Sequence, residues 1–203
     1  SLLWRIPLMT FDNPATRQWM LPVSYSDIST SYSHESANRA VDPQEGKGSG
    51  LFGIRASSYM KYRSSTLWGS AAYTNGILRS VVWNESADKE TVGPYVIADS
   101  VGGNMRAESY SFSGGYADHN ERWAWGVALG YEAGLYYRNV DPRPRNTTNR
   151  LDISAGASMR LGASDYAAGL SLSYRKYKQT ASLMFVNEMS NNRFWHLTGL
   201  GTH

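Results

Sequence analysis

The sequence predicts an all-β protein, an antiparallel up-and-down transmembrane β-barrel. Three observations lead to this prediction: apolar residues alternate with small or polar ones along most of the chain, the connections between these segments are long and short in turn, and aromatic residues gather near segment ends. The mean hydropathy is −0.45 and no run of about 20 apolar residues occurs, which excludes an α-helical membrane span. A membrane barrel remains compatible with that value because its strands alternate.

Composition narrows the class of protein further. Aromatic residues make up 13% of the 203 residues and charged residues only 18%, whereas disordered chains are rich in charge and poor in aromatics. The absence of cysteine excludes disulfides, thiolate metal sites and cysteine nucleophiles. The net charge of +3 comes from scattered Lys and Arg residues, so no nucleic-acid partner is expected.

The clearest predicted strand runs from Trp123 to Arg138. Its odd-numbered positions read Trp, Trp, Val, Leu, Tyr, Ala, Leu, Tyr, and its even-numbered positions read Ala, Gly, Ala, Gly, Glu, Gly, Tyr, Arg. Because successive strand side chains point to opposite faces, one face is entirely apolar and the other is small or polar. Similar patterns give six more candidate strands: 51–62, 66–76, 109–116, 151–161, 166–175 and a strand opening near Phe194. The Ser-rich segment 21–33, whose register is ambiguous, is the eighth candidate.

The connections between these strands alternate in length. Long links are expected over 34–49, 77–104, 139–149 and 179–193, and short ones over 63–65, 118–122 and 163–165. The long links hold loop formers such as Asp-Pro, Gly-Lys-Gly and Gly-Gly-Asn. Tight turns at one rim and long loops at the other are typical of an up-and-down barrel, and the lack of a long predicted helix excludes βαβ architectures.

A soluble sandwich or small barrel, with the apolar face as its core, is the alternative fold. Two features favour the membrane barrel. The face opposite the apolar one is Gly, Ala and Ser, which suits a crowded lumen. Aromatic residues lie at both ends of one strand, Trp123 and Trp125 at one end and Tyr136 and Tyr137 at the other, like the girdles of outer-membrane barrels. We therefore expect the outer membrane of a Gram-negative bacterium, with outer-membrane lipid around the barrel.

Two parts of the chain are expected. Residues 1–20 form an N-terminal segment, a short helix or plug, in which Asp12 or Asn13 caps the helix and Pro14 takes its first position. Residues 21–203 form the barrel strands. Because 194–203 read as a strand being entered and an open edge is not viable in lipid, we expect this chain to be the N-terminal part of a larger barrel.

The strand and loop style from Trp83 to Tyr177 resembles an uncharacterised outer-membrane β-barrel family of Bacteroidota. The tripeptide Asn13-Pro14-Ala15 is also similar to one near the N-terminus of fatty-acid-transporter-like barrels, where it belongs to an inserted N-terminal segment. The first resemblance implies a compartment and a fold and brings no catalytic motif. The second would imply a larger barrel with a plug.

No catalytic, cofactor or metal site is predicted, and we expect that the protein is not an enzyme. The histidines His34, His119, His196 and His203 do not pair at metal-ligand spacing. No Gly-x-Ser-x-Gly motif occurs, and the Gly-rich stretches do not precede a helix as a phosphate-binding loop would. The acids Glu85, Asp88 and Glu90 are read as a solvated loop.

The candidate functional residues are charged side chains on the small-residue face, which would line the lumen. They are Arg55, Lys61, Glu132, Arg138, Asp152, Arg160 and Arg175. In a large barrel such charges set solute selectivity or anchor a plug. The alternative is ion pairing between neighbouring strands without a transport role, for which Glu132 with Arg138, or Asp152 with Arg175, are natural partners.

Three functions are compatible with these features. The first is a porin-like barrel that passes or binds a small solute. The second is an accessory subunit of a larger outer-membrane complex, such as a TonB-dependent receptor or an assembly or secretion machine, with other outer-membrane proteins as partners. The third is a barrel enzyme, which would need a histidine and an acid brought together at the outer rim.

Overall fold

The computed structural model describes residues 13–88, 91, 96–141, 143–161, 167–185 and 194–197. Most of the predicted N-terminal segment and of the last predicted strand therefore lies outside the described residues. Within them the protein is all-β and antiparallel, as predicted, and its one described helix is the short 3-10 helix η2 (Pro14–Trp19). No described helix is long and apolar enough to cross a membrane.

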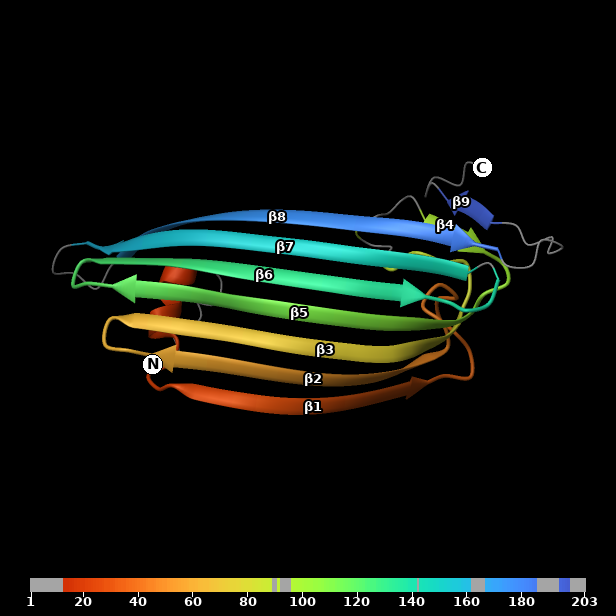
Figure 1. Cartoon of the computed structure of the whole chain (residues 1–203), viewed down its shortest axis with the longest axis horizontal. Coiled ribbons are helices and arrows are strands. Elements are labelled where there is room, and N and C mark those ends of the chain that lie inside the picture. Colours follow the sequence, from red (N-terminus) through yellow and green to blue (C-terminus); the bar gives the residue numbers. More distant parts are fainter. Residues whose placement is uncertain are drawn as a thin grey trace.

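Seven long strands form one antiparallel sheet in the order β1-β2-β3-β5-β6-β7-β8. Each pairs with its neighbour in sequence except that β4 is skipped, which is an up-and-down arrangement (Figure 1). The bounds are β1 Tyr25–Ser36, β2 Gly48–Lys61, β3 Ser65–Val81, β5 Gly103–His119, β6 Trp123–Tyr137, β7 Arg143–Arg160 and β8 Ala167–Met184. Among the described residues the sheet is not closed, because β1 and β8 pair on one side only.

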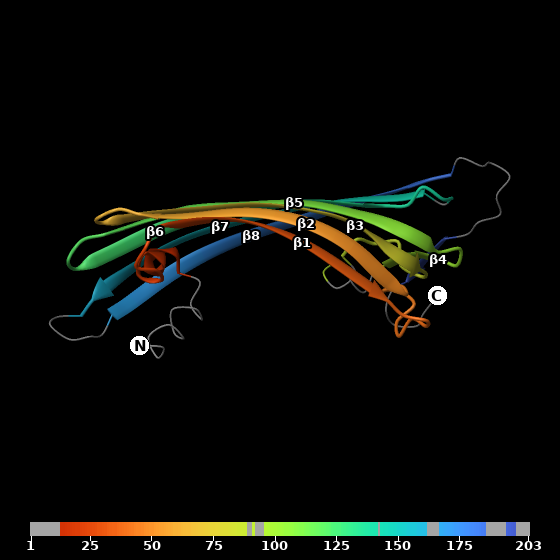
Figure 2. The ribbon, with the colours of Figure 1, turned by 90° about the horizontal axis from the view of Figure 1, so that it is seen from below.

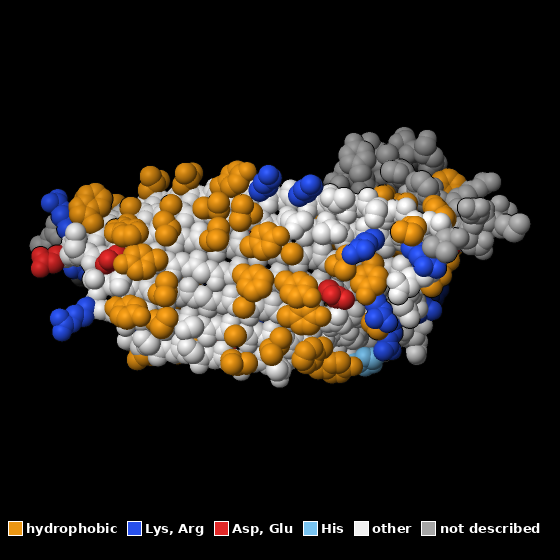
Figure 3. Space-filling model, viewed as in Figure 1, with side chains coloured by type: hydrophobic (Ala, Val, Ile, Leu, Met, Phe, Trp, Pro, Cys, Tyr) orange, Lys and Arg blue, Asp and Glu red, His pale blue; other side chains and the backbone are white. Residues whose placement is uncertain are grey.

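The sheet is strongly curved, and η2 lies inside the curve (Figure 2). We call the end with the connections 62–64 and 120–122 the turn end, and the opposite end the loop end. Directly paired residues of an antiparallel sheet point to the same face. The contacts of Gly126 and Gly156 with the Asn13-Pro14 segment therefore place the even-numbered positions of β6 and β7 on the concave face. The apolar odd-numbered positions lie on the convex face, as Figure 3 shows.

Two of the expected strands, 151–161 and the one opening near Phe194, differ from the prediction. The strand β7 begins at Arg143 rather than near 151, because Asn146, Thr147 and Thr148 pair fully with β6 although they lack the apolar alternation. The strand β9 (Phe194–Leu197) does not extend the large sheet. It pairs with β4 (Val96–Asp99), a strand that the sequence did not predict, in a separate two-stranded sheet.

The connection between β3 and β5 folds over the concave side at the loop end. Figure 2 shows β4, which belongs to this connection, beneath the sheet. The small core here consists of Val81, Met105 and Tyr136, with Leu78 and Ala107 packed against it. Both ends of the concave face therefore carry a folded segment: η2 at the turn end and the β3–β5 connection at the loop end.

Candidate functional site on the concave face

The segment at the turn end begins with a cap, as the sequence predicted. The Asn13 side chain accepts a hydrogen bond from the Ala15 backbone N–H at 2.9 Å, and Pro14 takes the first helical turn. The Asn13 amide nitrogen also donates to the carbonyl oxygens of Ala157 and Leu170, both at 3.4 Å. One side chain thus caps η2 and attaches it to two neighbouring strands.

Glycines of the sheet make room for this segment. A Cβ atom on Gly126 would lie 2.6 Å from the carbonyl carbon of Pro14, and one on Gly156 would lie 2.0 Å from Oδ1 of Asn13. Such distances are shorter than van der Waals contact. The sequence predicts small residues on this face as the lining of a crowded lumen, whereas in the structure Gly126 and Gly156 form a pocket that admits Asn13 and Pro14.

The other end of η2 is held by β2. The Tyr59 hydroxyl donates to the Arg17 carbonyl at 2.8 Å, and Nζ of Lys61 donates to the carbonyls of Gln18 at 3.1 Å and Leu21 at 3.2 Å. A cation at the C-terminal end of a helix satisfies carbonyls that have no partner within the helix. Lys61, predicted as a lumen residue, therefore holds η2 in place.

The middle of the concave face carries a chain of alternating charges. Arg150 lies 2.5 Å from Oε2 of Glu132 and 3.3 Å from Oδ2 of Asp152, and Asp152 also pairs with Arg175. The pair of Asp152 with Arg175 is the one suggested from the sequence. The pair of Glu132 with Arg138 is wrong: Glu132 stands opposite Arg150 on β7.

Arg150 is the member of this charge chain that the sequence analysis did not single out. It lies in β7, but the expected loop ended at residue 149 and the expected strand began at residue 151, so Arg150 was assigned to neither. The sequence does hold a signal, because Arg150 continues the even-numbered series of Asp152 and Ser154 that faces the interior.

Two further predicted cations lie on the concave face. Arg55 of β2 is exposed there and, among the described residues, has no acid within ion-pair distance. It lines a groove of about 320 Å³ together with Arg17, Trp68 and Asp152. The Arg17 guanidinium lies 5.6 Å from the centre of the Trp68 ring, a cation–π contact. Arg160 ends β7 at the turn end, and its backbone N–H donates to the Arg122 carbonyl.

Arg138 belongs to a different part of the molecule from the other predicted residues. It is buried at the loop end, where its guanidinium lies 2.7 Å from Oε1 of Glu85 and also pairs with Asp99. Both acids come from the β3–β5 connection, and Asn146 donates to the backbone carbonyl of Glu85. Glu85 was expected in a solvated loop, but its side chain is only 1% exposed.

Burial and the hydrogen bonds within this cluster shift the pKa values of its two carboxyl groups in opposite directions. The pKa of Glu85 is raised to about 8: burial makes the largest contribution, the hydrogen bond with Asp99 also raises the pKa, and the Arg138 charge partly offsets both. Burial also acts to raise the pKa of Asp99, but hydrogen bonds from Glu85, the Gly102 N–H and Arg138 outweigh it and lower that pKa. A protonated Glu85 donating to an ionised Asp99 leaves the cluster electrically neutral with Arg138. The arrangement fastens the β3–β5 connection to β6.

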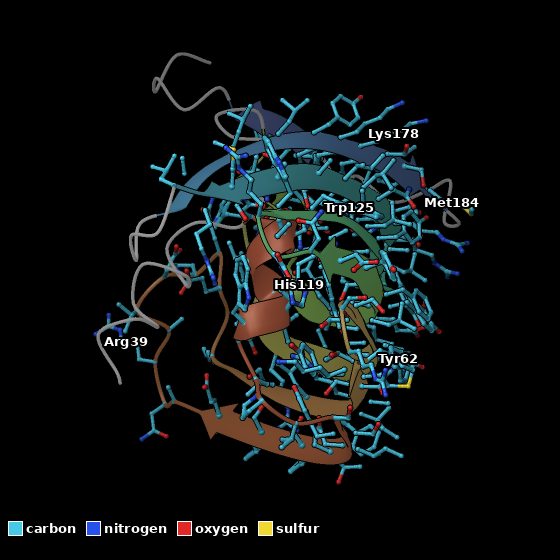
Figure 4. All side chains as sticks on the ribbon, turned by 90° about the vertical axis from the view of Figure 1, so that its left-hand side faces the viewer. Arg39, Tyr62, His119, Trp125, Lys178 and Met184 are labelled. Atoms are coloured by element: carbon cyan, nitrogen blue, oxygen red, sulfur yellow. The ribbon has the colours of Figure 1, made fainter. Side chains whose placement is uncertain are left out.

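The histidines do not assemble a site in the described part of the chain. His34 lies exposed in β1, and His119 ends β5 with its ring centre 6.3 Å from that of Trp19 on η2 (Figure 4). His196 lies in β9 and His203 lies outside the described residues. No group of three or more His, Cys, Asp or Glu residues among those described could hold a metal ion.

The fold and its concave face define a class of protein: an all-β chain whose curved antiparallel sheet has an apolar convex face and a polar concave face holding a docked N-terminal segment. A family model described as a family of unknown function, DUF6850, matches residues 14–203, so the chain belongs to that family. The comparison with curated proteins finds no match, and neither does the comparison with solved structures.

Proposed function

We propose that this chain forms part of the wall of a β-barrel in a bacterial outer membrane, and that the barrel passes or binds a small solute along its concave face. The convex face supports the membrane part of this proposal. Its large apolar side chains are exposed along the sheet, for example Leu129 at 53% and Leu172 at 77%. Monomeric soluble proteins rarely expose an apolar surface that continues over a whole sheet.

The direction of the apolar belt across the sheet is the observation that carries the proposal. Directly paired residues form rows that cross the sheet from β8 toward β1. The convex-face row that starts at Leu170 on β8 is apolar at Ala157 on β7 and Trp125 on β6. It becomes polar at Asp118 on β5 and Ser65 on β3. A second row starts at Lys176 on β8, closer to the loop end. Only its first residue is charged, and all the others are apolar: Leu151, Tyr131, Phe112, Ala71, Ala56 and Ile28. The belt therefore runs obliquely to the rows of paired residues.

The slope of the belt matches the tilt of strands in a membrane barrel. Toward the loop end, the last apolar convex-face residue of β8 is Tyr174. The row of paired residues that starts at Tyr174 reaches β1 at Ser26. On β1, however, the apolar convex-face residues continue six residues further toward the loop end, to Tyr32. This is a shift of about one residue per strand, which at about 3.3 Å per residue and 4.8 Å between strands corresponds to strands tilted by about 35° from the membrane normal. Membrane barrels have tilts of about 35–45°. A soluble core has no reason to follow this slope.

The proposal requires that the barrel be closed. Among the described residues no strand pairs with the outer edges of β1 and β8, and unpaired backbone groups are not tolerated in hydrocarbon. We infer that further strands pair with both edges, so that the concave face becomes the lumen. The lumen wall would then carry Arg55 and the charge chain from Glu132 to Arg175, between η2 and the Arg138 cluster.

An accessory subunit of a larger outer-membrane complex is the second candidate function. It is favoured by the two segments docked on the concave face, because η2 and the β3–β5 connection lie over its two ends. A barrel obstructed at both ends would serve as a partner for another protein. Stable co-purification with that protein and the absence of solute flux would distinguish this function from the first.

The substitution Leu129→Arg tests the membrane proposal. A cation on the lipid face near the bilayer midplane costs about 2–4 kcal/mol, so we expect the variant to be lost from the outer-membrane fraction. Gly130→Ser is the control, since Gly130 lies next in sequence but on the concave face, where an added Cβ would be 3.6 Å from its nearest neighbour. Normal assembly of Leu129→Arg would refute the proposal. Liposome swelling with the full-length protein then tests solute passage.

A further inference from the structure

Basic side chains follow the apolar belt on the convex face at the loop end. Figure 3 shows Lys and Arg side chains gathered there, beyond the apolar ones. The register places these residues on the same face as the belt: Arg79 on β3, Arg106 on β5, Arg143 and Arg145 on β7, and Lys176 and Lys178 on β8. All are exposed, and Lys178 points outward from the sheet in Figure 4. We call this set the basic collar.

The centre of the basic collar is a cross-strand row. Tyr137 on β6 pairs with Arg106 on one side and with Arg145 on the other. Because β5 and β7 are separated by β6, the Cα atoms of Arg106 and Arg145 are about 10 Å apart, with Tyr137 on the strand between them. Tyrosine is enriched at membrane interfaces, where its ring is apolar and its hydroxyl faces the headgroups.

Acidic side chains balance little of this charge. Arg143 pairs with Asp141 at 2.8 Å, and Glu108 lies on the convex face beside Arg106 along β5. No ion pair within 4.0 Å is present for Arg79, Arg106, Arg145, Lys176 or Lys178 among the described residues. The basic collar thus keeps a net positive charge at the edge of the apolar belt.

We propose that the basic collar binds the phosphate groups of a phosphorylated glycolipid in the outer leaflet of the membrane. This inference rests on the proposed membrane function. The side of the membrane follows from the connections: the longer ones, 37–47 and 82–102, lie at the loop end, and in bacterial outer-membrane barrels long loops are extracellular. Arginine recognises phosphate through paired N–H donors, and the position beside the belt puts these donors at headgroup level.

Lipid retention by the purified full-length protein tests the proposal. The protein is equilibrated in mild detergent with lipid A or with phosphatidylcholine, and native mass spectrometry counts the bound lipids. The variant R106Q/R145Q removes the two arginines beside Tyr137. The matched control R63Q/R122Q removes two exposed arginines at the turn end. We expect the first variant to bind lipid A about 30-fold more weakly and the control to bind it as the unmodified protein does.

Any of three results would overturn the proposal. The first is that R106Q/R145Q retains as much lipid A as the unmodified protein, and the second is that the unmodified protein retains phosphatidylcholine as well as lipid A. The third is displacement of lipid A by inorganic phosphate at the same concentration, which would indicate a site for free anions. Flotation of the unmodified protein with phosphatidylcholine vesicles separates this proposal from the preceding one. A protein that floats but does not select lipid A refutes only the glycolipid site. A protein that stays in solution without detergent refutes the membrane function as well.

Discussion

Replacing Gly126 by alanine should loosen the docked N-terminal segment without disturbing the strands of the sheet. The new Cβ would lie 2.6 Å from the carbonyl carbon and 2.7 Å from the carbonyl oxygen of Pro14, so backbone rather than a flexible side chain must move. Overpacking of this kind costs about 1–3 kcal/mol, which raises the undocked fraction of η2 about 5- to 150-fold.

Trypsin measures this change directly. In the docked state the Arg17 carbonyl accepts hydrogen bonds from the Tyr59 hydroxyl and from the Met20 N–H, so the Arg17–Gln18 bond is protected. When opening is fast relative to cleavage, the cleavage rate follows the undocked population. Appearance of a new N-terminus at Gln18, followed by mass spectrometry of the folded protein in detergent, should therefore accelerate by the same factor.

Gly130→Ala is the matched control. Gly130 lies on the same strand and the same face as Gly126, four residues further along the chain. Its added Cβ would be 3.6 Å from the Asp152 Cβ and would not touch the docked segment. Both variants should keep the gel migration of the folded, unmodified protein. Equal cleavage rates for the two folded variants would show that η2 is not held by the glycine pocket.

Three further predictions concern the charged groups. Glu85→Gln should remove a pH dependence of the stability. Because the pKa of Glu85 is raised from 4.5 to about 8, its contribution to stability is complete below about pH 4.5 and is lost as the pH rises through 8. The fall in Tm over this pH range should therefore disappear in the variant. Lys61→Met should remove two hydrogen bonds to carbonyls at the end of η2 and, at about 1–2 kcal/mol, accelerate tryptic cleavage at Arg17; an unchanged rate would contradict the role of Lys61. Arg150→Gln should change stability by less than about 1 kcal/mol, since its side chain is 48% exposed, but should shift conductance toward cations if the concave face lines a pore.

The local periodicity of the chain was sufficient to predict the long antiparallel strands of the sheet, but not all of their bounds. In β6 the alternation from Trp123 onward separates two faces over the whole strand, and the structure keeps that separation. Asn13 and Pro14 likewise predict their own cap, because a helix start depends on neighbouring residues alone. The small residues at even positions were recognised, but not the reason that Gly126 and Gly156 must be small, which is the segment docked against them.

Tertiary structure decided which charges meet and where the short strands pair. The partner of Glu132 depends on the register between β6 and β7, and the sequence of neither strand reveals that register. Burial of Arg138 depends on Glu85 and Asp99, which arrive from a connection between two other strands. The pairing of β9 with β4 joins segments about a hundred residues apart. Periodicity is a property of adjacent residues and can be read along the chain, whereas ion pairs and strand partners depend on contacts between distant segments, which only the folded chain brings together.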